Sequence, residues 1–231
     1  MENGCYPSLS ALKSKGISVL IFDLDGTLLD SMNVWNQVDI EFLGRYGHEV
    51  TPEYTDMVKR VSIEDAAKFT VDRYKIPLTP QEVMDTWNAM VGEFYKNEVE
   101  LKEGALDYLK EAKNSGFKLG VATALNRVNA FNSLRKNGIL ELFDAVITLE
   151  DTGKNTDKSS PDIFLKVLDY INAMGNMVAP GGALVFDDVP AACRGARMGD
   201  FKTCAVYDDI GCGKDRWNAF ASSCDYSLFK W

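Results

Sequence analysis

Residues 17–27 read ISVLIFDLDGT, a nearly continuous apolar run that ends in two aspartates, a glycine and a threonine. Short runs of this kind are typical of strands buried on both faces, as in a parallel sheet. Similar runs follow along the chain, the last of them weaker: residues 117–122, 145–149, 183–186 and 203–207. Helical patterns lie between them: residues 105–114, 126–136, 161–173 and 191–198. This alternation predicts an α/β fold with a doubly wound parallel sheet.

The stretch from about residue 31 to residue 100 breaks the alternation, because it contains no pattern of a buried strand. It contains three amphipathic helical patterns instead: residues 32–46, 64–74 and 80–97. The last begins with Thr79-Pro80-Gln81-Glu82, a capping box with proline at the first helical position. We therefore expect a Rossmann-like core domain of residues 1–30 and 101–231, with a helical subdomain of residues 31–100 inserted after the first strand.

Composition excludes several classes of protein. The chain has 231 residues, 46% of them hydrophobic, which is a globular balance, and its formal net charge is −9. A binder of nucleic acid or of anionic membranes is more often basic, and no apolar run approaches the ~20 residues of a membrane helix. We expect no nucleic acid or membrane as a partner. The N-terminal residues lack a signal-peptide pattern, so we expect a cytoplasmic protein.

The numbers of histidines and cysteines limit the kinds of catalytic or metal site that the chain can form. His48 is the single histidine, which disfavours a Ser-His-Asp triad or a histidine-rich zinc site. The five cysteines are odd in number and form no CxxC pair, so reduced thiols are expected rather than a disulfide framework. Carboxylates are therefore the main candidates for chemistry.

Polar side chains follow the predicted strands, at the edge where an open parallel sheet binds its ligands. They are Asp23, Asp25, Gly26 and Thr27 after the first strand, Thr123 and Ala124 after the second, Lys158 beyond the third, and Asp187 and Asp188 after the fourth. Each group alone has an ordinary explanation as a turn, a helix cap or a surface residue. Their coincidence at successive strand ends favours a single site.

The physical interpretation is a metal-assisted phosphate site. Converging carboxylates repel one another unless a cation lies between them, and oxygen-only ligands suit Mg²⁺. One carboxylate can serve as a nucleophile and form an aspartyl-phosphate, while another, two residues away, transfers protons. Gly26 lets backbone amides approach a phosphate closely. Thr123 can donate to a phosphate oxygen, and Lys158 supplies positive charge.

These segments resemble the motifs of the haloacid dehalogenase superfamily, in its phosphatase and β-phosphoglucomutase-like branch. The first motif, D-x-D-G-T, is matched by residues 23–27, and the second by Thr123. The third is matched by KSSPDIF at residues 158–164 and the fourth by DDVPAA at residues 187–192. The resemblance covers the chain from about residue 17 onward, and the four motifs together make it specific.

The resemblance implies a role for each matching residue. Asp23 would be the nucleophile and a metal ligand, and Asp25 the general acid/base, with its carbonyl also on Mg²⁺. Asp188 would be a direct metal ligand with Asp187 beside it, while Thr123, the Ala124 amide and Lys158 would hold phosphate. The inserted helices would form a cap over the site. We therefore expect a magnesium-dependent phosphomonoester hydrolase of a small phosphorylated metabolite, acting through an aspartyl-phosphate.

Two alternatives stay open at this level. A β-phosphoglucomutase-like mutase is disfavoured, because the family's cap histidine is replaced by Trp35 and its cap arginine by Ile63, unless Lys59 or Arg60 substitutes. The other alternative is a non-hydrolytic phospho-acceptor or an inactive binding protein on the same α/β scaffold; receiver domains have similar residues at their strand ends, but they are shorter and lack the 70-residue insertion. A dehalogenase would lack Asp25. The sequence identifies neither the substrate nor the oligomeric state.

Overall fold

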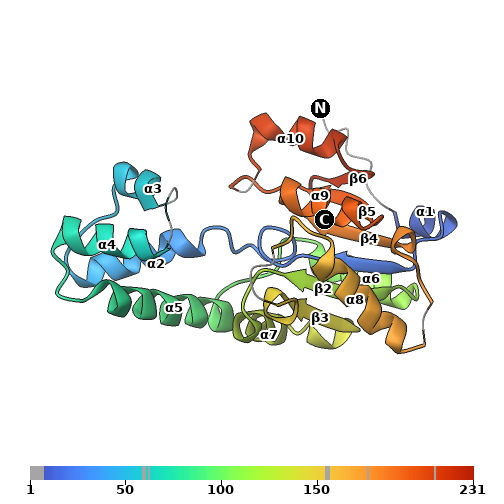
Figure 1. The fold of residues 1–231 in the computed structure, drawn as a ribbon, viewed down its shortest axis with the longest axis horizontal. Helices are drawn as coiled ribbons and strands as arrows, with labels where there is room; N and C mark the ends of the chain where they lie inside the picture. Colours follow the sequence, from blue (N-terminus) through green and yellow to red (C-terminus); the bar gives the residue numbers. More distant parts are fainter. Residues whose placement is uncertain (1–7, 59–60, 62, 154–156, 176, 211) are drawn as a thin grey trace. The chain divides into compact units, whose positions relative to one another are not determined.

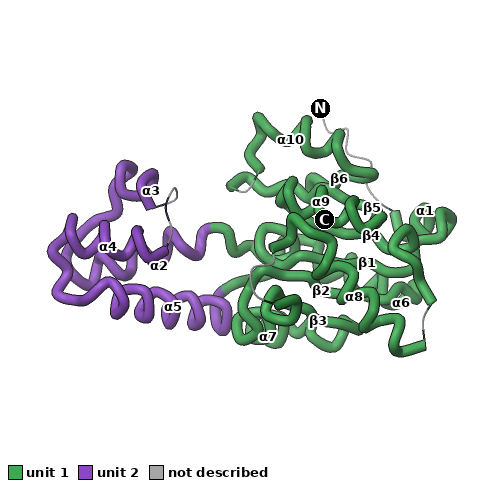
Figure 2. The backbone as a smooth tube through the Cα atoms, viewed as in Figure 1, with its two compact units in different colours: residues 1–32, 99–231 green, residues 33–98 purple. Residues whose placement is uncertain are grey.

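The computed structural model describes residues 8–58, 61, 63–153, 157–175, 177–210 and 212–231. The chain divides into two compact units, shown in different colours in Figure 2. Unit 1 comprises residues 1–32 and 99–231, and unit 2 comprises residues 33–98. Unit 1 contains the sheet and unit 2 is helical. No helix among the described residues is long and apolar enough to cross a membrane.

Unit 1 is built on one parallel sheet of six strands in the order β3-β2-β1-β4-β5-β6. The strands are β1 (Val19–Phe22), β2 (Lys118–Thr123), β3 (Ala145–Thr148), β4 (Ala183–Asp187), β5 (Lys202–Val206) and β6 (Tyr226–Leu228). The central strand β1 pairs with β2 and β4, so that Phe22 lies opposite Val121 on one side and Phe186 on the other. This register brings the segments that follow β1 and β4 together at one edge.

Helices cover both faces of this sheet (Figure 1). They are α1 (Leu9–Ser14), α6 (Ala105–Asn114), α7 (Arg127–Lys136), α8 (Asp162–Ala173), α9 (Pro190–Met198) and α10 (Lys214–Ser222). Because side chains alternate along a strand, Val19 and Ile21 pack in a cluster with α8 and α9. Phe22 points to the opposite face, where it stacks on Phe186 and meets Tyr108 of α6 edge-on.

Unit 2 consists of four helices: α2 (Val34–Arg45), α3 (Pro52–Val58), α4 (Ile63–Tyr74) and α5 (Pro80–Asn97). Phe42 of α2 meets Trp87 of α5 edge-on at 5.7 Å between ring centroids, in the apolar interior of the unit. The predicted capping box at the start of α5 is confirmed. The Thr79 hydroxyl accepts from the Glu82 amide at 3.3 Å, and the Thr79 amide donates to the Glu82 carboxylate at 2.8 Å.

The predicted fold class is confirmed: a doubly wound α/β unit with helices inserted after its first strand. Among the α-helices and strands of the described residues, three carried too little pattern to be predicted. Helix α3 buries only Tyr54 and helix α10 only Phe220, so neither shows the apolar stripe of a packed helix. Strand β6 has three residues, which is too short for an alternation to be recognised.

Candidate active site

The parallel pairing of β1 with β4 brings three aspartates together. Asp23 directly follows β1, and its amide donates to the Phe186 carbonyl of β4 at 3.0 Å. Asp187 ends β4 and Asp188 follows it. One carboxylate oxygen from each aspartate lies within 4.8 Å of the others, and all three side chains are buried. Strand ends 164 residues apart in the chain thus form one carboxylate cluster, as the strand order predicts.

Lys158 lies against this cluster. Its Nζ is 2.6 Å from Asp23 Oδ1 and 2.7 Å from Asp187 Oδ2, and only a tenth of its side chain is exposed. Burial acts to lower the pKa of Lys158, but the charges of Asp187 and Asp23 outweigh it and raise the pKa above its usual value. The lysine is therefore a fixed cation.

Gly195 of α9 is a residue that sequence reasoning missed. A Cβ at this position would overlap the main chain of Lys158 and Ser159, so a glycine is what lets the lysine segment pack directly on α9. The signal that could have found it is the glycine itself, inside a helix where alanine has the higher helix propensity.

Asp188 is the least satisfied member of the cluster. Its Oδ1 accepts a hydrogen bond from the Thr27 hydroxyl at 3.3 Å, whereas its Oδ2 is buried and has no hydrogen-bond partner among the described residues. Burial, followed by the charge of Asp187, raises the pKa of Asp188 to about 7. Burial also raises the pKa of Asp23. Three buried carboxylates with one lysine leave an excess of negative charge, and an oxygen-only set fits a divalent cation such as Mg²⁺.

The loop after β1 is shaped by Gly26 and held by Lys102. Gly26 has φ +71°, and a Cβ there would lie 2.5 Å from Asp188 Oδ2. Lys102 donates from Nζ to the Gly26 carbonyl, to the Tyr207 carbonyl at 3.2 Å and to Asp208 Oδ2 at 2.8 Å. Sequence reasoning missed Lys102, because nothing in its local pattern indicates that it reaches a loop 76 residues earlier.

The remaining predicted residues lie around the cluster. The half-buried Asp25 accepts a hydrogen bond from Ser31 Oγ, and its charge acts on Asp23. Thr123 ends β2 and is buried, with its Oγ1 accepting from the Leu125 amide at 3.1 Å, and Ala124 is exposed. Among the described residues, no hydrogen bond joins Thr123 or Ala124 to the three aspartates. They follow the same edge of the sheet, because β2 neighbours β1.

The two positions that bear on mutase chemistry lie in unit 2. Trp35 is 47% exposed and Ile63 is 42% exposed. The Ile63 side chain has no polar atom to meet a phosphate, and neither Trp35 nor Ile63 carries an acid or base that could transfer a proton. Lys59 and Arg60, the possible substitutes, lie outside the described residues.

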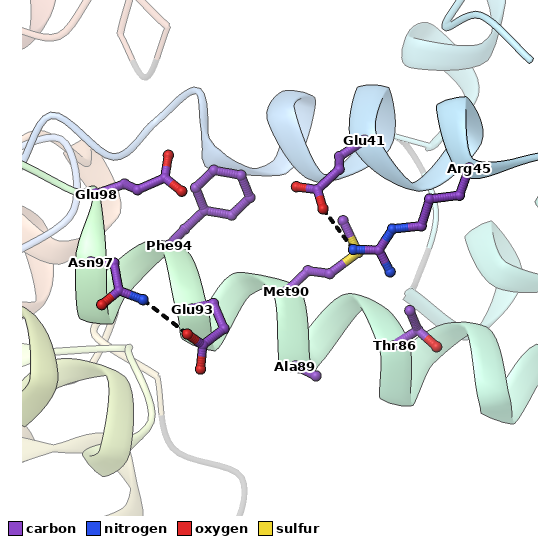
Figure 3. Close-up of a pocket in the computed structure, with 9 residues that line it drawn as sticks. All are labelled: Glu41, Arg45, Thr86, Ala89, Met90, Glu93, Phe94, Asn97 and Glu98. Atoms are coloured by element: carbon purple, nitrogen blue, oxygen red, sulfur yellow. Dashed lines mark hydrogen bonds and ion pairs between the residues drawn. The ribbon is translucent and has the colours of Figure 1, made fainter.

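Unit 2 also has a cavity of its own, of about 440 Å³, between α2 and α5 (Figure 3). Met90 and Phe94 line it with the Glu41–Arg45 ion pair of α2. The predicted site residues do not line it. Within it Glu93 accepts a hydrogen bond from Asn97 and Glu41 pairs with Arg45, as the dashed lines in Figure 3 mark.

The chain is similar to known proteins over most of its length. The family profile described as haloacid dehalogenase-like hydrolase matches residues 20–206. An uncharacterized protein of Schizosaccharomyces pombe is 27% identical over 190 residues, which cover 77% of this chain and 75% of that protein. The pyrophosphatase PpaX of Bacillus cereus (strain Q1) is 25% identical over 200 residues, with 82% and 83% covered.

Among solved structures, a Thermotoga maritima protein assigned as a β-phosphoglucomutase superposes with a TM-score of 0.78. The alignment covers 93% of this chain and 94% of that one at 22% sequence identity. At this identity the likeness concerns the fold: a sheet-based core with helices inserted after the first strand.

Proposed function

We propose, from the premise that this chain belongs to the haloacid dehalogenase-like hydrolase family, that it hydrolyses phosphomonoesters of a small metabolite with the help of Mg²⁺. The observation that carries the proposal is the buried cluster of Asp23, Asp187 and Asp188 with Lys158 bonded to it. Relatives named pyrophosphatase support phosphate chemistry as the class of reaction.

The carboxylates after β1 divide the chemistry between them. Asp23 attacks phosphorus, a P–O bond to Asp23 forms, and the bond to the substrate oxygen breaks. Asp25, protonated at that moment, gives its proton to the departing oxygen. In the second half, Asp25 takes a proton from water, whose oxygen attacks phosphorus and releases phosphate and free Asp23. The contact between Ser31 Oγ and Asp25 orients the second carboxylate for these transfers.

The positive charge comes from two sources. Lys158 is a permanent one, and it would receive phosphate oxygens next to Asp23, with which it forms an ion pair. Asp23, Asp188 and the Asp25 carbonyl would hold Mg²⁺, with Asp187 beside them. When bound, Mg²⁺ neutralises the carboxylates and polarises the phosphoryl group. Asp188 Oδ2 supports this assignment: it is buried without a hydrogen-bond partner among the described residues, which is costly unless a cation meets it.

The other phosphate contacts follow from the strand ends. Thr123 would donate its hydroxyl and Ala124 its amide to phosphate oxygens, while the Cβ-free Gly26 leaves room for backbone amides to approach. The helices of residues 31–100 would serve as a cap that excludes water from the core domain of residues 1–30 and 101–231.

The decisive experiment is turnover of an aryl phosphate by purified Asp23→Asn protein, with and without Mg²⁺. Loss of the nucleophile should lower turnover by about 10³-fold or more while thermal unfolding stays cooperative. Asp30→Asn is the matched control, because it removes the same charge from an exposed residue of the same segment. Turnover that survives in Asp23→Asn, or that is independent of Mg²⁺, contradicts the proposal. Bisphosphate-dependent isomerisation of a sugar phosphate without release of phosphate would favour the mutase.

A further inference from the structure

The side chain of Trp231 reaches the loop that follows β1, which lies 204 positions earlier in the chain. Its indole Nε1 lies 2.9 Å from the Thr27 carbonyl oxygen and donates a hydrogen bond to it. Thr27 has no exposed surface, and no second donor to this carbonyl is found among the described residues. The indole therefore supplies the hydrogen bond that a buried backbone carbonyl requires.

The ring of Trp231 packs on the two strands that present the aspartates. Its centroid lies 5.9 Å from that of Phe22 in β1 and 5.5 Å from that of Phe186 in β4. Phe22 directly precedes Asp23, and Phe186 directly precedes Asp187. Because aromatic rings in such contacts have few alternative positions, this packing fixes the direction in which the indole N–H points.

The neighbourhood of Trp231 is built to hold the same loop. Gly104, the N-cap of α6, has φ +85°, and a Cβ there would lie 2.8 Å from the Trp231 carbonyl oxygen. Lys102 holds the carbonyls on either side of Thr27, since its Nζ donates to Gly26 and its amide donates to Leu28 at 2.8 Å. Three successive carbonyls of the loop are thus held by donors that lie outside it.

Thr27 connects this arrangement to the aspartate cluster. Its hydroxyl donates to Asp188 Oδ1 at 3.3 Å, which is long compared with the ~2.7–2.8 Å that is common for such bonds. A small shift of Thr27 away from Asp188 therefore breaks this contact. In the proposed function Asp188 is a ligand of Mg²⁺, and removing a group that orients a metal ligand typically changes metal affinity or activity by roughly 10–100-fold.

We propose that Trp231 is a positioning residue for the metal site: its indole N–H fixes Thr27, and the Thr27 hydroxyl orients the Asp188 carboxylate. The inference rests on the proposed function, because it takes Asp188 to be a ligand of Mg²⁺. It requires that loss of the indole N–H and loss of the Thr27 hydroxyl weaken metal binding by the same route.

The test is isothermal titration calorimetry of the metal-free chain with Mg²⁺ alone, so that binding rather than turnover is measured. Trp231→Phe keeps an aromatic ring and removes the N–H, and Thr27→Val keeps the shape of the side chain and removes the hydroxyl. We expect each variant to raise the Kd for Mg²⁺ on the order of 10-fold. The double variant should bind no more weakly than Thr27→Val alone, because both changes break one chain of contacts.

Trp217→Phe is the matched control. It makes the same chemical change in α10, where the ring packs on Tyr207 and Phe229, and it should leave the Kd for Mg²⁺ unchanged. Thermal unfolding without Mg²⁺ shows which variants are folded. An unchanged Kd in folded Trp231→Phe overturns the inference. Losses that multiply to about 100-fold in the double variant also overturn it, because Trp231 would then act by a route that does not pass through Thr27.

A second measurement requires no variant to fold. In the ¹⁵N-labelled wild-type chain, the Trp231 indole signal is assigned through its contacts with the ring of Tyr108, whose centroid is 5.1 Å away. Mg²⁺ should shift this signal, and a signal that stays in place while Mg²⁺ binds overturns the inference. A wild-type chain that binds no Mg²⁺ overturns it as well. A chain that binds Mg²⁺ as expected but does not hydrolyse an aryl phosphate contradicts the proposed function and leaves the role of Trp231 standing.

Discussion

Replacing Gly26 by alanine tests whether the loop after β1 and Asp188 are packed as closely as the structure shows. The position has φ +71°, a left-handed conformation that costs an L-residue roughly 1–2 kcal/mol. The new Cβ would lie 2.5 Å from Asp188 Oδ2. Relief to an ordinary contact distance of ~3.5 Å requires a displacement of about 1 Å. A displacement of that size at a catalytic group lowers turnover on the order of 10²-fold.

Gly138→Ala is the matched control for this variant. Gly138 follows the C-cap of α7 with φ +65°, so alanine there has the same conformational cost, but none of the described residues lies within 4 Å of the added Cβ. Both variants should lower the melting temperature by about 2–8 °C, since 1 kcal/mol corresponds to about 2–4 °C in a chain of this size. Only Gly26→Ala should also lose Mg²⁺-dependent turnover of an aryl phosphate at 25 °C.

The comparison between the two variants shows whether the close approach of Gly26 to Asp188 is needed for turnover. If Gly26→Ala and Gly138→Ala lose stability equally and both keep turnover, the close approach of Gly26 to Asp188 is not needed for chemistry. If Gly26→Ala keeps its melting temperature, the left-handed conformation itself is wrong. Either result would refute the geometry from which the loss is calculated.

Three further predictions concern other parts of the chain. Lys102→Met should lower the free energy of unfolding by roughly 2–4 kcal/mol in urea titrations and reduce turnover, because the Gly26 carbonyl loses its donor; unchanged values would show that this contact is dispensable. Thr79→Ala should speed hydrogen exchange of the α5 amides, since a helix cap contributes ~1 kcal/mol, and equal exchange rates would argue against the cap. Burial acts to raise the pKa of Asp144, but hydrogen bonds from two lysines and a backbone amide lower it below its usual value. Its contribution should therefore be present near pH 7 and lost below about pH 4; a stability difference between wild type and Asp144→Asn that does not shrink in acid would contradict this.

Local patterns were sufficient for most of the fold. The apolar run at residues 17–22 and its later counterparts predicted five of the six strands, because a strand buried on both faces has an apolar side chain at nearly every position. The capping box at Thr79 predicted the start of α5 to the residue, since all its partners lie within one helical turn. Helix α10 was missed because a helix that buries one side chain has no stripe to recognise.

The residues of the candidate site also fall into two groups: those that the local sequence predicts and those that depend on packing between distant segments. The aspartates could be predicted because parallel strands end at one edge, so each candidate is found by reading one residue past an apolar run. Close approaches between distant segments could not be predicted in this way. Residue 26 must lack a Cβ because Asp188, 162 positions later in the chain, lies against it. Residue 195 must lack a Cβ because the main chain of Lys158 packs on α9 there.

The sequence by itself therefore determined the class of fold, the inserted helices and the carboxylates at the strand ends. These depend on periodicity and on the residues directly after each strand, and both are properties of neighbours in the chain. Only the tertiary structure decided that Lys102 holds the Gly26 carbonyl and that Asp188 has one carboxylate oxygen without a hydrogen-bond partner among the described residues. Such contacts depend on how elements pack, and packing brings together atoms whose separation in sequence carries no periodic signal.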